Sequence, residues 1–263
     1  MSNKSAVAVP ECLKKFEEEL ISFQREYVRV TANSLPNKLT DDPLGILSSK
    51  FLGKPSLPLK YDYPVDDKGK PMFLLAQINF SEVPNLEGFP TSGLLQLYLP
   101  TEDWYPEESA KILFIPEKEL YEPSYEDFNF LSESSYTESP VWKIHQLHFS
   151  RSIDTGCGED CQFDVSFDDQ EYWGFEDSLE ESEQSEFLEY FSCDGHKIGG
   201  YGGFTQGDVR ENLAGAQDDI QLLQIDVDDD IMFGDSGVAH IFINPNSLKE
   251  GKFEHAYFYW DCC

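Results

Sequence analysis

The sequence predicts an α+β protein that is predominantly β, with two related β-rich lobes from an internal duplication and an N-terminal helix. Three observations support this fold class. Aromatic residues are numerous, with 20 Phe and 13 Tyr, and such residues favour strands. Short apolar runs bounded by Gly, Pro, Asn and Asp recur along most of the chain. One order of motifs also occurs twice.

The first expected element is a helix over residues 10–29. Five apolar residues recur there at intervals of three or four: Leu13, Phe16, Leu20, Phe23 and Tyr27. This spacing places them on one face of a helix. Pro10 suits the first helical turn, where its missing N–H would have no partner in any case. We expect the apolar stripe to pack on the main body of the protein.

A Pro-rich loop separates this helix from a series of strand-like segments, which are short and rich in aromatic and β-branched residues. They span residues 72–80, 94–99, 112–115, 141–149, 163–167, 221–227, 238–243 and 256–260. A second helix is expected over residues 177–191, followed by Gly195 as a C-cap. Because strands and helices do not alternate regularly, a dinucleotide-binding fold is excluded.

A repeated interval predicts the duplication. Gly53 precedes Gln77 by 24 residues, and Gly200 precedes Gln224 by the same number. Each glutamine lies in an apolar strand, and a glycine opens the next strand soon afterwards. We therefore expect two lobes that pack into one compact unit with a shared cleft. The expected division is an N-terminal helix and linker (1–44), a first lobe (45–150) and a second lobe (151–263).

Acidic residues strongly outnumber basic ones. The chain holds 50 Asp and Glu against 19 Lys and Arg, which gives a net charge of −31 at pH 7. Such a chain repels nucleic-acid phosphates and anionic membrane surfaces, so neither is an expected partner. Basic proteins, cations and neutral ligands remain open as partners. Alternatively, the acids serve solubility or adaptation to salt, without any partner.

The sequence indicates a cytoplasmic protein that is a monomer or a weak oligomer. No apolar run reaches the roughly 18 residues of a membrane span. The first ten residues lack the apolar core of a signal peptide. We expect the cysteines to be reduced in this compartment rather than paired in disulfides. The six cysteines are Cys12, Cys157, Cys161, Cys193, Cys262 and Cys263.

Several motifs follow one another along nearly the whole chain. They are Leu52-Gly-Lys-Pro-Ser-Leu-Pro58, Phe73-Leu-Leu-Ala-Gln-Ile-Asn79, Gly93-Leu-Leu-Gln-Leu97, His196-Lys-Ile-Gly-Gly-Tyr201, Leu222-Leu-Gln-Ile-Asp226, Gly234-Asp-Ser-Gly237 and Trp260-Asp-Cys-Cys263. In this order they resemble the YwqG-like family, a bacterial family of unknown function. Where members of that family often have Pro, this chain has Gly202 and Val209. The family has no established catalytic residues that the resemblance could assign to this chain.

No cofactor, catalytic residue or metal site is predicted. Cys157 with Cys161, and Cys193 with His196, have the spacing of zinc-ligand pairs, but this spacing also suits ordinary turns. Residues 226–230 imitate the opening of an EF-hand loop. The Gly and the bidentate Glu that this loop requires further on are absent, so an EF-hand is excluded.

One polar constellation is a candidate ligand-binding site, because it mixes acids, a base and amides. Its members are His196, Gln206, Arg210, Gln224, Asp226 and Asp235. Such residues at strand ends also commonly satisfy backbone groups in turns. Our leading hypothesis is a non-catalytic binding protein with an acidic surface and a basic protein as partner. The alternative is an enzyme, or a binder of a small ligand or cation, with its site in the inter-lobe cleft near His196, Arg210, Asp226 and Asp235.

Overall fold

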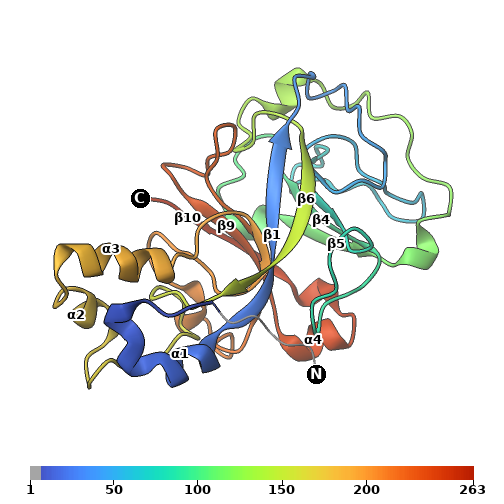
Figure 1. Ribbon diagram of the computed structural model, residues 1–263. Helices are drawn as coiled ribbons and strands as arrows, with labels where there is room; N and C mark the ends of the chain where they lie inside the picture. Colours follow the sequence, from blue (N-terminus) through green and yellow to red (C-terminus); the bar gives the residue numbers. More distant parts are fainter. Residues whose placement is uncertain (1–6) are drawn as a thin grey trace.

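Every strand in residues 7–263, which the computed structural model describes, belongs to one antiparallel sheet (Figure 1). The sheet is nearly closed, and its ten strands follow the order β10-β9-β8-β7-β1-β6-β2-β3-β4-β5. The strands are β1 (Arg25–Ser34), β2 (Lys50–Phe51), β3 (Phe73–Asn79), β4 (Leu94–Leu99), β5 (Lys111–Ile115), β6 (His145–Asp154), β7 (Lys197–Gly199), β8 (Ile220–Ile225), β9 (Val238–Ile243) and β10 (Tyr257–Asp261). The prediction of a predominantly β protein is therefore confirmed.

The helices are short and lie outside the sheet. The α-helices are α1 (Glu17–Phe23), α2 (Tyr172–Glu176), α3 (Glu181–Tyr190) and α4 (Pro245–Lys249). The 3-10 helices are η1 (Glu11–Phe16), η2 (Glu107–Ser109), η3 (Glu117–Glu119), η4 (Glu133–Tyr136), η5 (Val209–Glu211) and η6 (Phe253–His255). In the described part of the chain, no helix combines the length and apolarity that a membrane crossing requires. Figure 1 shows α1, α2 and α3 gathered on one side of the molecule.

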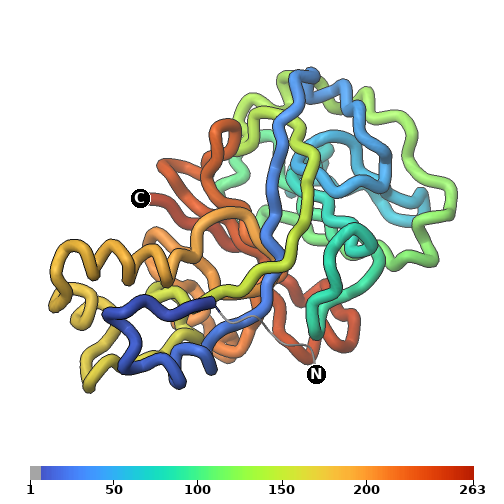
Figure 2. The backbone as a smooth tube through the Cα atoms, in the orientation of Figure 1, coloured from blue at the N-terminus to red at the C-terminus, as the bar shows by residue number. Residues whose placement is uncertain are grey.

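The two longest strands, β1 and β6, form the centre of the sheet. They pair over ten residues each, with Thr31 opposite His148 near the middle, and run side by side in Figure 2. β1 also pairs with β7, and β6 also pairs with β2. The long strand of the first half (β1–β5) is β1, and it therefore lies next to β7 from the second half. The long strand of the second half (β6–β10) is β6, and it lies next to β2 from the first half.

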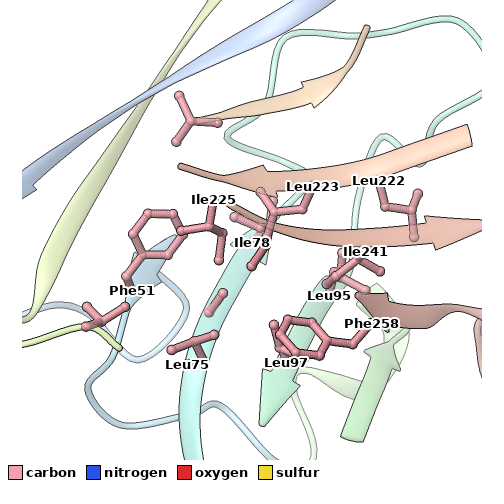
Figure 3. Close-up of a cluster of buried hydrophobic side chains, with 14 of the residues drawn as sticks. Phe51, Leu75, Ile78, Leu95, Leu97, Leu222, Leu223, Ile225, Ile241 and Phe258 are labelled. Atoms are coloured by element: carbon pink, nitrogen blue, oxygen red, sulfur yellow. The ribbon is translucent and has the colours of Figure 1, made fainter. Parts of the chain in front are cut away.

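One hydrophobic core is shared by the two groups of strands, β2–β5 and β7–β10. β3, β4 and β9 are buried at every position, which explains why their sequences are mostly apolar and do not alternate between apolar and polar residues. Figure 3 shows Ile78, Leu95 and Leu97 from β3 and β4 near Leu223 and Ile241 from β8 and β9. Both groups thus contribute to the same apolar interior.

The N-terminal helix is shorter than predicted. Helix α1 ends at Phe23 and β1 begins at Arg25, so the prediction of a helix over 10–29 is wrong for its last part. From Val28 onward, buried and exposed residues alternate as far as Thr31, which is the period of a strand. Pairing with β6 on one side and β7 on the other secures the extended conformation.

A second, mainly aromatic core fixes the N-terminal helix to the body of the protein. Leu13 and Leu20 are buried there, together with Phe163, Phe187 and Tyr201. The predicted packing of the apolar stripe on the main body is therefore confirmed. This core also joins α1 to the segment that carries α2 and α3.

Other segments also depart from the predictions. Residues 163–167 do not form a strand, because they turn within the aromatic core and make only an isolated bridge. The helix predicted over 177–191 begins later, at Glu181, after the separate helix α2. Strand β6 starts at His145 rather than at residue 141. Strands β2 and β7 were not predicted, because two or three residues carry no measurable periodicity.

Candidate functional site

Two buried lysines occupy matching places beside the central strands. Lys50 opens β2, and Lys197 opens β7 147 positions later. Nζ of Lys50 lies 2.8 Å from Oδ2 of Asp42, and Nζ of Lys197 lies 3.0 Å from Oδ2 of Asp154. All four side chains are buried. A buried charge needs a hydrogen-bonded partner, so each pair fixes its aspartate firmly in place.

The same two carboxylates hold the glycine loops that follow β2 and β7. Oδ2 of Asp42 also accepts the backbone N–H of Lys54 at 2.8 Å, and Oδ2 of Asp154 accepts that of Tyr201 at 3.0 Å. The residue before each of these amides is a glycine with positive φ, and a Cβ there would lie 2.5 Å from the carboxylate oxygen. Glycine is therefore required at both places.

Gln77 and Gln224, again 147 positions apart, anchor the same loops through their side-chain amides. Oε1 of Gln77 accepts from the N–H of Ser56 at 2.9 Å, and Oε1 of Gln224 accepts from that of Gly203 at 3.0 Å. Each Nε2 donates to two backbone carbonyls at 2.9 Å. The side chain of Gln224, a candidate ligand-binding residue, is thus engaged by backbone groups. Its role in ligand binding stays a prediction.

His196 and Asp226 lie together where β7 begins and β8 has just ended. Nδ1 of His196 accepts the N–H of Asp226 at 2.9 Å, and Oδ2 of Asp226 accepts the N–H of Gly195 at 2.5 Å. Nε2 of His196 lies 3.5 Å from Oδ2 of Asp228. Burial lowers the pKa of His196 below its usual value despite that carboxylate, so the ring is neutral at pH 7.

Arg210 belongs to a different buried cluster, at η5. Its guanidinium lies 2.6 Å from Oδ2 of Asp208 and 2.8 Å from Oδ2 of Asp160, and it donates to the backbone carbonyl of Asp219 at 2.8 Å. Burial alone would lower the pKa of Arg210, but the hydrogen bond with Asp208 and the charges of both aspartates raise it. The guanidinium therefore ties the connection between β6 and β7, through Asp160, to the connection between β7 and β8.

The last two candidate residues lie near the C-terminal strand. The backbone N–H of Gln206 donates to Oδ2 of Asp261 at 2.7 Å, and its side chain donates to the carbonyl of Cys262 at 2.5 Å. Asp235 is exposed, and its carbonyl accepts the N–H of Cys263 at 3.1 Å. Three of the six candidates thus share the cluster at β7 and β8, and the other three belong to separate networks.

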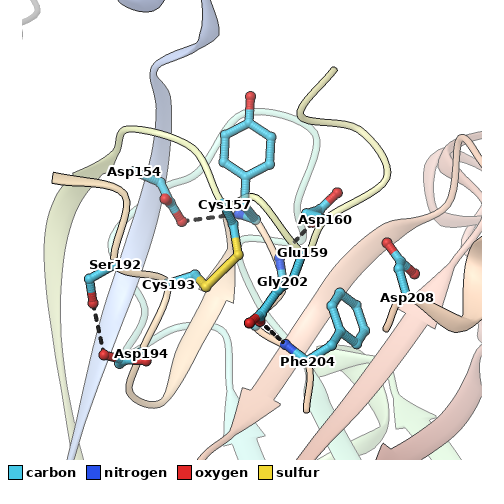
Figure 4. Close-up of a disulfide and its surroundings, with 12 residues drawn as sticks. Asp154, Cys157, Glu159, Asp160, Ser192, Cys193, Asp194, Gly202, Phe204 and Asp208 are labelled. Carbon is cyan, nitrogen blue, oxygen red and sulfur yellow. Dashed lines mark hydrogen bonds between the residues drawn. A yellow bond between two sulfur atoms is a disulfide. The ribbon is translucent and has the colours of Figure 1, made fainter. Parts of the chain in front are cut away.

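A disulfide between Cys157 and Cys193 links the loop after β6 to the loop after α3 (Figure 4). The prediction of six reduced cysteines is wrong for this pair. The two residues are 36 positions apart and meet only after α2 and α3 fold back, so sequence spacing gave no sign of the bond. The disulfide takes one cysteine from each of the two pairs with zinc-like spacing, and the backbone N–H of Cys161 donates to Oδ2 of Asp208 at 3.0 Å.

The segment between β6 and β7 forms an acidic face, which we define as residues 155–195. It contains 14 Asp and Glu and no Lys or Arg, and most of its carboxylates on α2 and α3 are exposed. Two lysines that lie nearby on η1 are already paired, Lys14 with Glu17 and Lys15 with Asp168. The field over this face is therefore negative and suited to a cationic partner.

Two large apolar side chains are exposed within the acidic face. Trp173 on α2 is 49% exposed, and Leu188 on α3 is 46% exposed. Their chain neighbours Tyr172 and Phe187 pack together with ring centroids 4.7 Å apart, which fixes α2 against α3. Sequence reasoning missed both residues, because it does not show which apolar residue of a short helix stays outside. The available signal was a tryptophan inside a strongly acidic stretch.

A cavity of about 740 Å³ lies beside α3. Its lining includes Glu186, Glu189 and Asp194 from the acidic face, with Tyr27 and Arg29 from β1. Carboxylates outnumber the one arginine in this lining, so the cavity favours positively charged groups. It therefore extends the negative character of the acidic face into the body of the protein.

Comparison with known proteins places the chain in a family. The family model for a domain of unknown function (DUF1963) matches residues 49–262, which include every strand from β2 to β10. No curated protein matches the chain. Because the match covers far more than half of the sequence, the protein belongs to the family of this domain of unknown function, DUF1963.

Proposed function

We propose that the protein is a non-catalytic binding protein whose acidic face binds a basic protein. One observation carries the proposal: residues 155–195 hold 14 Asp and Glu and no Lys or Arg, together with two exposed apolar side chains. Protein interfaces combine an apolar centre with a polar rim. Trp173 and Leu188 form the centre, and the carboxylates form a rim that attracts Lys and Arg.

The exposed tryptophan and leucine distinguish this proposal from solubility alone. A partner that covers these two side chains removes apolar surface from water, a contribution to binding that a merely solubilising face does not make. The net charge of −31 also accelerates encounters with a basic partner at low salt. The adjacent cavity, with Glu186 and Glu189 in its lining, accommodates a basic side chain of that partner.

The test is an affinity capture from native lysate, at low and high salt, with three forms of the full chain. One variant changes exposed acids of the acidic face to amides: Glu171→Gln, Asp177→Asn, Glu181→Gln, Glu186→Gln and Glu189→Gln. The matched control changes five exposed acids elsewhere: Glu87→Gln, Glu117→Gln, Glu126→Gln, Asp218→Asn and Asp229→Asn. The wild type and the control should retain the same basic protein at low salt, and the acidic-face variant should lose it.

The purified partner then allows a second measurement. Trp173→Ala should weaken its binding by tenfold or more, because interface tryptophans commonly contribute about 2 kcal/mol or more. Equal retention by the acidic-face variant and the control would contradict the proposal. So would an unchanged affinity after Trp173→Ala.

We also propose that the two halves of the chain arose by duplication, within a YwqG-like branch of the family. The support is the constant offset of 147 positions between Lys50 and Lys197 and between Gln77 and Gln224, with the same contacts in each half. The strand irregularities between Leu74 and Ala76 and between Gln221 and Leu223 have that offset too. Independent origins would not reproduce such a register.

A further inference from the structure

Strands β5 and β10 are the two edges of the sheet. Among the residues that the structure describes, β5 pairs with β4 alone and β10 with β9 alone. Helix η2, which precedes β5, packs against β10, and helix η6, which precedes β10, packs against β5. The two edges therefore approach one another across a seam, and each carries backbone groups that no further strand satisfies.

A cavity of about 620 Å³ lies in this seam. Its lining comes from both edges, with Lys111 and Ile112 from β5 and Tyr257 and Phe258 from β10. Leu213, which is 40% exposed, adds a further apolar surface. The seam is thus a hollow with an apolar lining between two incomplete strand edges.

Acidic side chains surround the hollow. Glu107, Glu108 and Glu254 line it, against the single cation Lys111. Within residues 7–263, none of these four groups takes part in an ion pair. Burial and the nearby charge of Glu108 raise the pKa of Glu107 above its usual value. A bound cation would relieve this crowding of carboxylates.

We propose that the seam between β5 and β10 binds an extended, basic peptide segment of another protein. The peptide adds as a strand to one edge, where its backbone N–H and C=O groups bond to those that the edge leaves free. Its side chains alternate in direction. Apolar ones pack on Ile112 and Leu213, and Lys or Arg side chains reach the glutamates. The seam shares no residue with the acidic face, so this site is additional to the proposed function.

The test measures binding of a defined probe to the full chain. The probe is a hexapeptide of alternating Val and Lys, acetylated and amidated at its ends, and titration calorimetry gives its affinity. The matched control is the same peptide with N-methyl groups at alternate residues, which removes donors without changing charge. The methylated peptide should bind at least about tenfold more weakly, equivalent to about 1.4 kcal/mol. Equal affinity, or no binding of the unmethylated probe at millimolar concentration, would overturn the proposal.

Two variants locate the binding. Glu107→Gln combined with Glu108→Gln should weaken the probe severalfold, whereas Trp173→Ala on the acidic face should leave its affinity unchanged. Amide hydrogen exchange should show new protection in residues 111–115 or 257–261. If Trp173→Ala weakens the probe and the glutamate variant does not, the peptide binds the acidic face and the seam proposal is wrong. Loss of partner binding at the acidic face leaves this experiment unaffected.

Discussion

Three buried histidines, His145, His196 and His240, respond to acid in the same direction. Burial lowers the pKa of each below its usual value, for His240 to about 3. An unfolded histidine takes up a proton below about pH 6.5, whereas these buried rings take one up only at lower pH. Below about pH 6.5 the unfolded state therefore binds more protons than the folded state. The free energy of unfolding consequently falls on acidification, and the stability that these neutral histidines provide is complete only above about pH 6.5.

His240 offers a precise test, because its counterpart in the first half is a glutamine. His240 lies opposite Gln224, as Gln96 lies opposite Gln77. We expect His240→Gln to fold at pH 7 and to unfold at lower pH than the wild type. The lowered pKa of His240, about 3, corresponds to a loss of up to about 5 kcal/mol in the free energy of unfolding of the wild type by pH 3. Circular dichroism between pH 8 and 3 measures the midpoint.

The control for this experiment is His255→Gln, since His255 is exposed and its replacement should leave the acid midpoint in place. An unchanged midpoint in His240→Gln would show that burial of this ring does not govern acid unfolding. Decreased stability at pH 7 would instead report a lost contact, such as the one between Nδ1 of His240 and Oε1 of Gln221 at 2.8 Å.

The residue types of the candidate site could be predicted from the sequence, but their contacts could not. His196, Gln224 and Asp226 were selected as polar residues at strand ends, and the structure brings them together around Gly195. The partner of each atom depends on the path of the loop before β7, which no spacing encodes. Arg210 was selected for its charge, and the folded chain buries that charge among aspartates.

At the scale of elements, predictability followed segment length and sequence pattern. Strands β4 and β9 were predicted with their observed ends, because an apolar run between turn residues has few other interpretations. The error at β1 arose because the helical spacing of the N-terminal stripe continues to Tyr27, one residue before strand alternation begins. The observed boundary depends on β6 and β7, which lie more than a hundred positions away.

The disulfide stabilises the element pair α2–α3. Its cysteines are 36 positions apart, and closing a loop of this length contributes about 4 kcal/mol in the chain-entropy model. We expect the double variant Cys157→Ser, Cys193→Ser to lose stability of that order in urea unfolding. Dithiothreitol should lower the stability of the wild type similarly.

The exposed thiol of Cys263 provides the control for this comparison, because Cys263→Ser should unfold at the wild-type urea concentration. If reduction changes neither the unfolding midpoint nor amide exchange in α2 and α3, the bond does not hold this segment in place.

At the scale of the whole molecule, the family match and the folded unit differ in extent. The match begins at residue 49, whereas β1, one of the two central strands, ends at Ser34. Without β1, both β6 and β7 would lose a neighbour in the middle of the sheet. Interior edges of this kind expose unpaired backbone and promote aggregation.

A fragment of residues 49–263 should therefore fail to form the native sheet, although it contains the complete family match. We expect low soluble yield and a circular dichroism spectrum without the cooperative thermal transition of the full chain. Adding residues 1–48 as a separate peptide should restore part of the transition. A fragment that unfolds cooperatively at the temperature of the full chain would show that β1 is dispensable.

The exchange of β1 and β6 between the two halves has a consequence for assembly. A chain cut between β5 and β6 would yield two pieces, each with a long strand whose neighbours lie in the other piece. A single half made alone could satisfy that strand only through a second copy of itself. It would then assemble as a twofold-symmetric homodimer, with its axis where Thr31 now faces His148. On the duplication proposed above, the present protein corresponds to such a dimer joined into one covalent chain.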